Sequence, residues 1–202
     1  MNDQSPLAPP GIFKAYDIRG LYGEEMDETT ALAIGRAFAR VLGRLRGKQT
    51  SELRVGLGRD MRLTAPAMAG AVREGLVAEG ATVIDAGQVA TEMLYHLVGS
   101  RELDGGAMVT ASHNPKAYTG VKLVREGALP LSGDAGIGDV KAEIETGLGE
   151  APGGGSAEGV DIWDEYHAHA LSFIDASSVK PMVVVVDGGN GMAGPMAGPI
   201  LE

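Results

Sequence analysis

A serine at the end of an apolar segment is the residue whose type and position most favour chemistry. Ser112 belongs to the hexapeptide TASHNP at residues 110–115, which includes the end of an expected strand at residues 106–110. Proteins of the α/β class usually present reactive groups in the crevice outside the strand ends, so this position makes the hydroxyl accessible. A serine becomes an effective nucleophile when a base takes its proton or a cation stabilises its oxygen, and the nearby candidates are His113 and Lys122.

The same hexapeptide also fits a purely structural turn. In that interpretation Ser112 and Asn114 hydrogen-bond backbone groups, while Pro115 sets the bend. The residue types of the hexapeptide do not by themselves separate a reactive serine from a capped turn.

Two further motifs carry charged side chains that could serve such a serine. Arg19 lies in FKAYDIRG at residues 13–20, and its planar guanidinium suits phosphate oxygens, whereas the alternative is an ion pair with Asp17 or Glu24. Arg59 and Asp60 follow another expected strand, and we expect them to form a supporting ion pair beneath the serine loop. The remaining histidines have no ligand pattern and are expected to be structural or exposed; they are His96, His167 and His169.

Strands and helices that alternate along the chain must position these residues. Apolar spacing predicts helices at residues 27–46, 64–79, 91–98, 132–146 and 161–175, and strands at 53–57, 81–85, 106–110, 120–125 and 181–187. Thr64 is a candidate helix cap. The strand at 120–125 follows too soon for a helical crossover, so it is expected to pair antiparallel. The pattern indicates an α/β fold: a three-layer α/β/α domain with a mixed, mainly parallel sheet.

A glycine-rich stretch suggests where one domain ends. We expect a first domain at residues 1–150, a flexible linker at 147–159 and the start of a second, similar domain at 160–202. The apolar run at 182–186 is typical of a strand covered on both faces. A βαβ unit needs roughly 30 residues, and far fewer follow this run, so we expect the chain to be a fragment truncated in its second domain.

The overall composition excludes several classes of partner. The net charge of -10 argues against binding to nucleic acid or to an anionic membrane, because both require clustered cations. The chain has no cysteine, which excludes disulfides and thiolate metal sites and favours a cytoplasmic location. Neither a signal peptide nor a membrane-spanning segment is expected. The sequence does not predict an oligomeric state.

Four segments together resemble one enzyme family. The stretches FKAYDIRG, VGLGRDMR (residues 55–62) and TASHNPKAYTGVK (110–122) are similar, in order, to the signatures of the first domain of α-D-phosphohexomutases. VVVVDGGNG resembles the first strand of that family's second domain, and AYDIRG favours the phosphomannomutase/phosphoglucomutase type. One departure is Thr119 before Gly120, where the family usually has Asn-Gly; Gly120 is expected to permit a turn there.

This resemblance implies a phosphohexomutase that uses Ser112 as a phosphoserine. The serine would exchange its phosphoryl group with a hexose 1-phosphate or 6-phosphate through a bound hexose 1,6-bisphosphate, which also serves as activator. It further implies that Lys122 assists proton transfer or stabilises charge near the phosphoserine and that Arg19 is also catalytic. His113 is expected to orient Ser112 or to move a proton. The remaining residues expected to bind the substrate are Tyr16, Arg19 and Asn114.

The family also uses Mg²⁺, which Ser112 would bind through its phosphoryl oxygen. The other ligands come from an aspartate loop of the second domain that this sequence lacks, so we expect the chain alone to have little or no mutase activity. One alternative is a truncated, non-catalytic domain that acts as a binding module. Another is a nucleotide-binding protein that uses DGGNG at residues 187–191, although this loop lacks the Lys-Ser/Thr of a P-loop.

Overall fold

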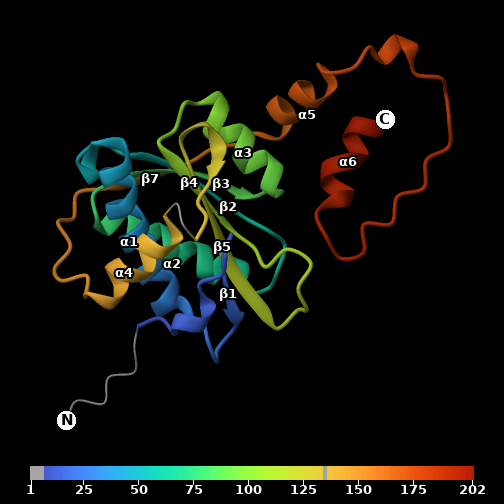
Figure 1. Cartoon of the computed structure of the whole chain (residues 1–202). Coiled ribbons are helices and arrows are strands. Elements are labelled where there is room, and N and C mark those ends of the chain that lie inside the picture. The colour runs from blue at the N-terminus through green and yellow to red at the C-terminus, as the bar shows by residue number, and fades with distance from the viewer. Residues whose placement is uncertain (1–6, 134–135) are drawn as a thin grey trace.

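The computed structural model describes residues 7–133 and 136–202. A central β-sheet has helices on both faces (Figure 1). The expected three-layer α/β/α architecture with a mixed sheet is therefore confirmed. None of the described helices is long and apolar enough to cross a membrane.

One strand runs against all of its neighbours in this sheet. The order is β1-β5-β4-β2-β3-β7, and β6 pairs with the C-terminal end of β5. Strand β5 is antiparallel to β1, β4 and β6, whereas the pairs β4–β2, β2–β3 and β3–β7 are parallel. The expected antiparallel pairing after the serine loop is confirmed. The strands are β1 (Ile18–Leu21), β2 (Arg54–Arg59), β3 (Thr82–Gln88), β4 (Gly105–Val109), β5 (Tyr118–Arg125), β6 (Leu129–Pro130) and β7 (Ser156–Gly159).

Two apolar cores separate the helices into layers. Helices α1, α2 and α4 pack on the face of the sheet that presents Val55 and Leu57. Helix α3 packs on the other face against Met108 and Val124. Residues next to one another in β4, such as Ala107 and Met108, thus enter different cores, because successive side chains of a strand point to opposite faces. The helices are α1 (Glu28–Arg46), α2 (Ala65–Ala78), α3 (Thr91–Ser100), α4 (Ile137–Glu145), α5 (Trp163–Leu171) and α6 (Ala193–Leu201).

Local signals explain both ends of α1. Helix α1 begins after Asp27, whose Oδ1 accepts a hydrogen bond from the backbone N–H of Thr30 at 2.9 Å, and it ends at Gly47 with a φ of 63°. Thr64 precedes α2 as expected, but its side chain makes no capping bond. Helix α4 begins later than predicted, at Ile137, and part of the predicted segment lies at positions 134–135, outside the described residues.

Helices α1 and α2 touch through glycines. A Cβ atom added to Gly75 of α2 would lie 2.3 Å from the backbone oxygen of Leu32, and one added to Gly35 of α1 would lie 2.3 Å from that of Val72. No Cβ fits at such distances without movement of the backbone. The two glycines therefore set how closely the first two helices pack.

We expect Gly75→Ala and Gly70→Ala to have opposite effects, although both lie in α2. Alanine favours a helix over glycine by about 1 kcal/mol, but at position 75 the steric clash outweighs this gain, so the free energy of unfolding falls by about 1–3 kcal/mol. At Gly70 no heavy atom lies within 4 Å of an added Cβ, so Gly70→Ala is expected to stabilise the protein. Urea unfolding of the three proteins checks this. A Gly75→Ala protein as stable as Gly70→Ala would contradict the packing.

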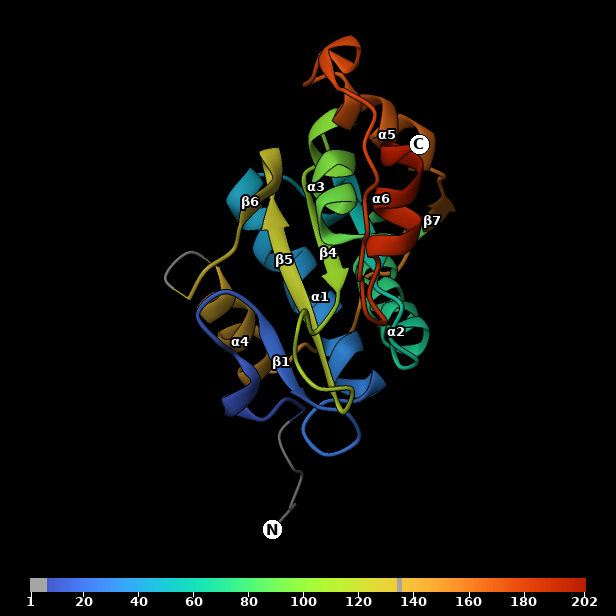
Figure 2. The same ribbon diagram turned by 90° about the vertical axis from the view of Figure 1, so that its right-hand side faces the viewer.

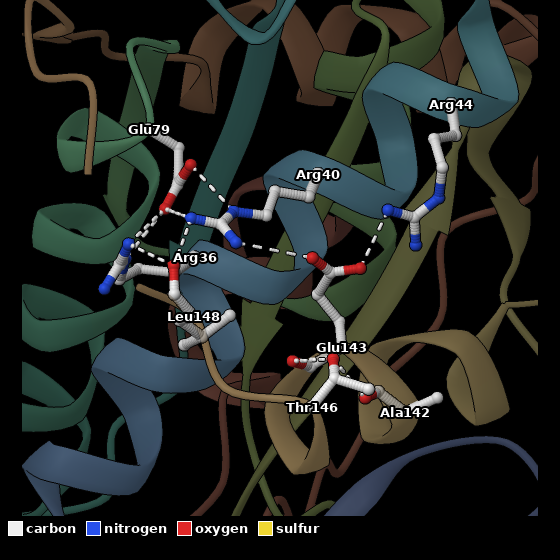
Figure 3. Close-up of polar contacts among 8 residues, drawn as sticks. All are labelled: Arg36, Arg40, Arg44, Glu79, Ala142, Glu143, Thr146 and Leu148. Atoms are coloured by element: carbon white, nitrogen blue, oxygen red, sulfur yellow. Dashed lines mark hydrogen bonds and ion pairs between the residues drawn. The ribbon is translucent and has the colours of Figure 1, made fainter. Parts of the chain in front are cut away.

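An ion-pair network fastens α1 to α2, α4 and the segment after α4 (Figure 3). Glu79, at the end of α2, is 2% exposed and lies 2.7 Å from Arg36 and 2.9 Å from Arg40. Arg36 and Arg40 also donate to the backbone oxygen of Leu148. Glu143 of α4 accepts from Arg40 and from Arg44. The arginines lie four residues apart, so they share one face of α1.

Removal of the charge of Glu79 is expected to destabilise the protein by about 2 kcal/mol. Breaking a fully buried ion pair costs about 3–5 kcal/mol, and the partial exposure of the two arginines reduces this value. Glu79→Gln measured by urea unfolding tests the expectation. The matched control is Glu145→Gln, which removes an exposed pair with Lys141 and should change stability by less than about 0.5 kcal/mol. Equal effects of the two variants would show that the network contributes little.

Two expectations for the C-terminal third require correction. The stretch 147–159 is not wholly a connection, because Ser156–Gly159 forms β7 and pairs parallel with β3 at the edge of the sheet. The strand predicted at 181–187 is not formed. These residues belong to no helix or strand (Figure 1). Val183 and Val185 are almost fully exposed. A strand requires a neighbour for its backbone hydrogen bonds, and no described segment pairs with this one.

Candidate active site

Ser112 lies in the loop that joins β4 to β5, beyond the carboxyl end of β4 (Figure 2). The residue is exposed and has a φ of 53°, a left-handed backbone conformation that is uncommon for residues other than glycine. Such a conformation costs about 1–3 kcal/mol and persists only where the surroundings impose it. The contacts around the loop must therefore hold this serine.

A chain of hydrogen bonds anchors Ser112 to the neighbouring strand. The hydroxyl of Thr110 donates to Asp60 Oδ2 at 2.7 Å, and its oxygen accepts the backbone N–H of Ser112 at 2.9 Å. Asp60 follows β2, the strand next to β4 in the sheet. The side chains of Thr110 and Asp60 are both buried, so the bond between them is shielded from water.

Arg62 makes the most extensive contacts with the loop. Its guanidinium donates to four backbone oxygens at 2.6–3.1 Å, which belong to Ser112, Asn114, Pro115 and Tyr118. Arg62 Nε also lies 3.4 Å from Asp60 Oδ2. The expected pairing of Asp60 with Arg59 is wrong, because Arg59 points to Gln88 and Arg62 takes its place. Sequence reasoning assigned no role to Arg62, although its place in VGLGRDMR was a signal.

The side chains of His113 and Asn114, on either side of the serine loop's centre, make different hydrogen bonds. His113 Nδ1 lies 3.3 Å from Ser112 Oγ, within reach for proton transfer. Asn114 Nδ2 donates to the backbone oxygen of Ala111 at 2.7 Å, so part of its hydrogen-bonding capacity lies within the turn. Of the capped turn considered from the sequence, only the Asn114 bond is formed, because the Ser112 hydroxyl contacts His113 and no backbone group of the described residues. Asn114 fastens the turn, and Ser112 Oγ projects from it beside His113.

Arg19 and Lys122 lie on the same face of the sheet. Lys122 is opposite Met108 in the register of β4 and β5, and Arg19 is opposite Gly120 in the register of β1 and β5. Residues directly opposite or two apart along a strand share a face, so the two cations lie on the same face as Met108. Asp17 lies between them, with Oδ2 at 3.7 Å from Arg19 and 3.8 Å from Lys122.

Gly120 is required for close packing of strands and not for a turn. It lies within β5, and a Cβ atom there would approach the backbone oxygen of Ile18 to 2.6 Å and that of Thr110 to 3.0 Å. The expectation that it permits a turn is therefore corrected. Its missing side chain lets β1, β5 and the end of β4 come together, which brings Arg19 near the serine loop.

A cavity of about 690 Å³ opens beside the loop. Its lining includes Ser112, His113, Lys116, Met61, Leu63 and Asn190. Arg19, Lys122 and Tyr16 do not line it, and Tyr16 is 70% exposed. The structure therefore brings Ser112 and His113 together around one hollow and places the two cations on the adjoining strands.

The residues around Ser112 do not form a magnesium site by themselves. No group of three or more carboxylates or histidines in the described ranges could hold a metal ion. Asp60, the carboxylate beneath the loop, accepts hydrogen bonds from Thr110 and from the backbone of Arg62. Ser112 alone offers one exposed hydroxyl oxygen, too few ligands for Mg²⁺.

The remaining histidines lie away from the serine loop. His96 Nε2 of α3 is 3.0 Å from Glu165 Oε1 of α5. A hydrogen bond from Arg101 is the main reason why the pKa of Glu165 falls below its usual value, and Ser100 and His96 contribute further bonds against the opposing effect of burial. This cluster joins α5 to α3, which agrees with the structural role expected for His96.

Comparison with known proteins identifies relatives along most of the chain. A family model described as phosphoglucomutase/phosphomannomutase, alpha/beta/alpha domain I, matches residues 10–148. The phosphomannomutase of Salmonella montevideo is 43% identical over 188 residues, and that of Vibrio cholerae is 41% identical over 183 residues. These matches cover 91% and 90% of this chain but only 39% of each relative. The chain thus spans about two fifths of the length of the curated relatives it matches.

Solved structures agree with the sequence comparison. A phosphoglucomutase/phosphomannomutase family protein from Burkholderia thailandensis superposes with a TM-score of 0.85 at 37% sequence identity, covering 96% of this chain and 42% of that protein. A putative phosphomannomutase from Thermus thermophilus gives a TM-score of 0.70 at 29% identity, with coverages of 82% and 36%.

Proposed function

Because the chain belongs to the phosphoglucomutase/phosphomannomutase family, we propose that it is the phosphoserine-bearing part of a phosphohexomutase. The enzyme would interconvert hexose 1-phosphate and hexose 6-phosphate. The observation that carries the proposal is the state of Ser112: an exposed hydroxyl on a strained turn, held from beneath by Arg62 and Asp60 and accompanied by His113.

Ser112 in its phosphorylated form would give its phosphoryl group to the free hydroxyl of a bound hexose phosphate. The P–O bond to Ser112 Oγ breaks while a P–O bond to the sugar oxygen forms, and the proton of the sugar hydroxyl is released. The product of this step is a hexose 1,6-bisphosphate. After the bisphosphate turns round, the opposite transfer returns a phosphoryl group to Ser112 and leaves the isomeric monophosphate.

The residues beside Ser112 fit the needs of these steps. When the phosphoryl group leaves, Ser112 Oγ gains negative charge and requires a proton, and His113 Nδ1 at 3.3 Å is placed to supply it. Phosphoryl transfer depends mainly on positioning and cationic stabilisation. Arg62 and Asp60 provide the positioning. Arg19 and Lys122 would provide positive charge, and Tyr16 and Asn114 are the remaining candidates for sugar contacts.

The chain alone is proposed to have little mutase activity. Its own residues around Ser112 do not complete a Mg²⁺ site, and the cation would supply charge neutralisation during the transfer. We propose that the first domain extends beyond the expected end at residue 150 and includes β7, because β7 pairs with β3 in the same sheet. The ion-pair network at Glu79 and Leu148 supports placing the boundary after these contacts.

Peptide mass analysis of the whole enzyme tests the proposed function. The protein used is one in which this chain is followed by segments equivalent to the remainder of its relatives. It is incubated with a hexose 1,6-bisphosphate and Mg²⁺. We expect one phosphate on the peptide that contains Ser112, and interconversion of mannose or glucose 1-phosphate with the 6-phosphate. If the protein isomerises neither sugar phosphate and carries no phosphate on this peptide, the proposal is wrong.

A further inference from the structure

Asp17 differs from the other buried carboxylates. Asp60, Glu79 and Asp104 each accept hydrogen bonds of 2.6–3.1 Å from other side chains or the backbone. The side chain of Asp17 has no hydrogen bond within the described part of the chain, and its contacts are the two cations at 3.7 and 3.8 Å. It is thus buried, but its only contacts with charged side chains are these longer-range ones.

Within the described part of the chain, Arg19 and Lys122 likewise have few side-chain partners. Neither Arg19 nor Lys122 donates a side-chain hydrogen bond to any described residue, and Asp17 is the only carboxylate of that part that contacts them. Arg62 contrasts with them, because its donors are engaged by backbone oxygens of the loop. The side chains of Arg19 and Lys122 are 27% and 26% exposed, so both are in contact with solvent.

The register explains why Asp17 meets both cations. Ile18 is opposite Val121, so one step further along β1 and β5 brings Asp17 beside Lys122. Arg19 is two residues from Asp17 and therefore lies on the same face. Because these positions are fixed by the sheet, a carboxylate at position 17 neutralises part of the charge of this pair whenever no other anion is present.

We propose that Asp17 is the counter-ion that Arg19 and Lys122 share before a phosphoryl group arrives, and that it limits how tightly they hold that group. This inference rests on the proposed function, because a phosphoryl group is the anion that the pair would meet. The pair alone carries two positive charges, and Asp17 reduces the total to one. A dianionic group would be held more tightly without Asp17, whereas a mutase must also release it.

The binding of inorganic phosphate tests this inference in the 202-residue protein at low ionic strength. Nuclear magnetic resonance of the Lys122 ammonium and Arg19 guanidinium reports binding at the pair. Asp17→Asn removes a negative charge that lies 3.7 and 3.8 Å from the two cations, so it should lower the phosphate Kd by about fivefold. Asp17→Glu retains the charge and should bind as the wild type does. Asp164→Asn, at an exposed position of α5, controls for net charge and should leave Kd unchanged.

A second measurement needs no variant and so does not depend on how Asp17→Asn folds. In the wild-type protein, phosphate should shift the carboxyl carbon resonance of Asp17 along with the resonances of Lys122 and Arg19. An unchanged or weaker affinity in folded Asp17→Asn, or an Asp17 resonance that phosphate leaves in place, would overturn the inference. These readouts do not involve Ser112 chemistry, so failure of the mutase assay and failure of this inference are separate results.

In the whole enzyme the same variant should lower KM and kcat together. Tighter holding of the phosphorylated ligand lowers KM, and slower release lowers kcat. A merely structural role of Asp17 would instead raise KM or lower the unfolding temperature without tightening phosphate binding. Rescue of both kinetic constants in Asp17→Glu is expected, and its absence would count against a role for the charge.

Discussion

Replacement of Ser112 by alanine is expected to abolish both phosphorylation and mutase activity. The variant has no oxygen to carry the phosphoryl group, so the two-step route through a covalent intermediate is lost. We expect turnover of the whole enzyme to fall by at least about a thousandfold, in line with the loss of other covalent nucleophiles. The measurements are the rate of conversion of hexose 1-phosphate to 6-phosphate and the mass of the peptide around residue 112.

Ser51→Ala is the matched control for this variant. Ser51 is exposed on the opposite, amino-terminal side of β2, and its removal should leave both activity and phosphorylation unchanged. Thermal unfolding should show that Ser112→Ala remains folded, because the side chain of Ser112 is exposed. Turnover of Ser112→Ala near that of the wild type would show that another group carries the phosphoryl group.

Replacement of Arg62 by alanine is expected to lower kcat of the whole enzyme by about a hundredfold. Four backbone oxygens of the serine loop would lose their donor, and the strained backbone at Ser112 would relax toward a commoner conformation. A displacement of about 1 Å in a reacting group is enough for a loss of this size. Because the loop moves and the distant parts of the substrate site do not, KM should change much less than kcat.

The variant Arg62→Lys separates the effect of the shape of the Arg62 side chain from the effect of its charge. Arg62→Lys retains the positive charge but lacks the planar fork, so it cannot reach all four oxygens, and we expect an intermediate loss. Arg73→Ala, which removes a half-exposed arginine of α2 paired with Asp85, is the control and should retain activity. Hydrogen exchange of the amides at 112–114 and 116–118 should be faster in Arg62→Ala than in the wild type. Wild-type turnover with unchanged exchange would refute the positioning role.

Much of the first domain could be predicted from the sequence. The helix at Glu28–Arg46 follows from its apolar spacing, from Asp27 at its start and from Gly47 at its end, all of which act within a few residues. The antiparallel direction of β5 follows from the short distance along the chain after β4. By contrast, Ser156–Gly159, which follows a run of glycines, could not be predicted as β7, because its pairing with β3 depends on a segment that is distant in the sequence.

The C-terminal third shows the limit of reading a strand from composition. The apolar run at 182–186 has the residues of a buried strand, yet these residues are largely exposed and unpaired in this structure. A β-strand is defined by hydrogen bonds to a neighbour, and local sequence cannot supply the neighbour. A helix makes its backbone bonds within its own segment, which is why α5 was predicted within a few residues while this strand was not.

The sequence by itself determined the family, the α/β architecture and the hexapeptide that contains Ser112, because these depend on local spacing and on motifs of adjacent residues. Only the tertiary structure decided that Arg62, rather than Arg59, supports the serine loop, and that Asp17 lies between Arg19 and Lys122. These contacts join residues that are about 50 and 100 positions apart. Their formation depends on which strands become neighbours and in which register, and that is fixed by the packing of the whole sheet.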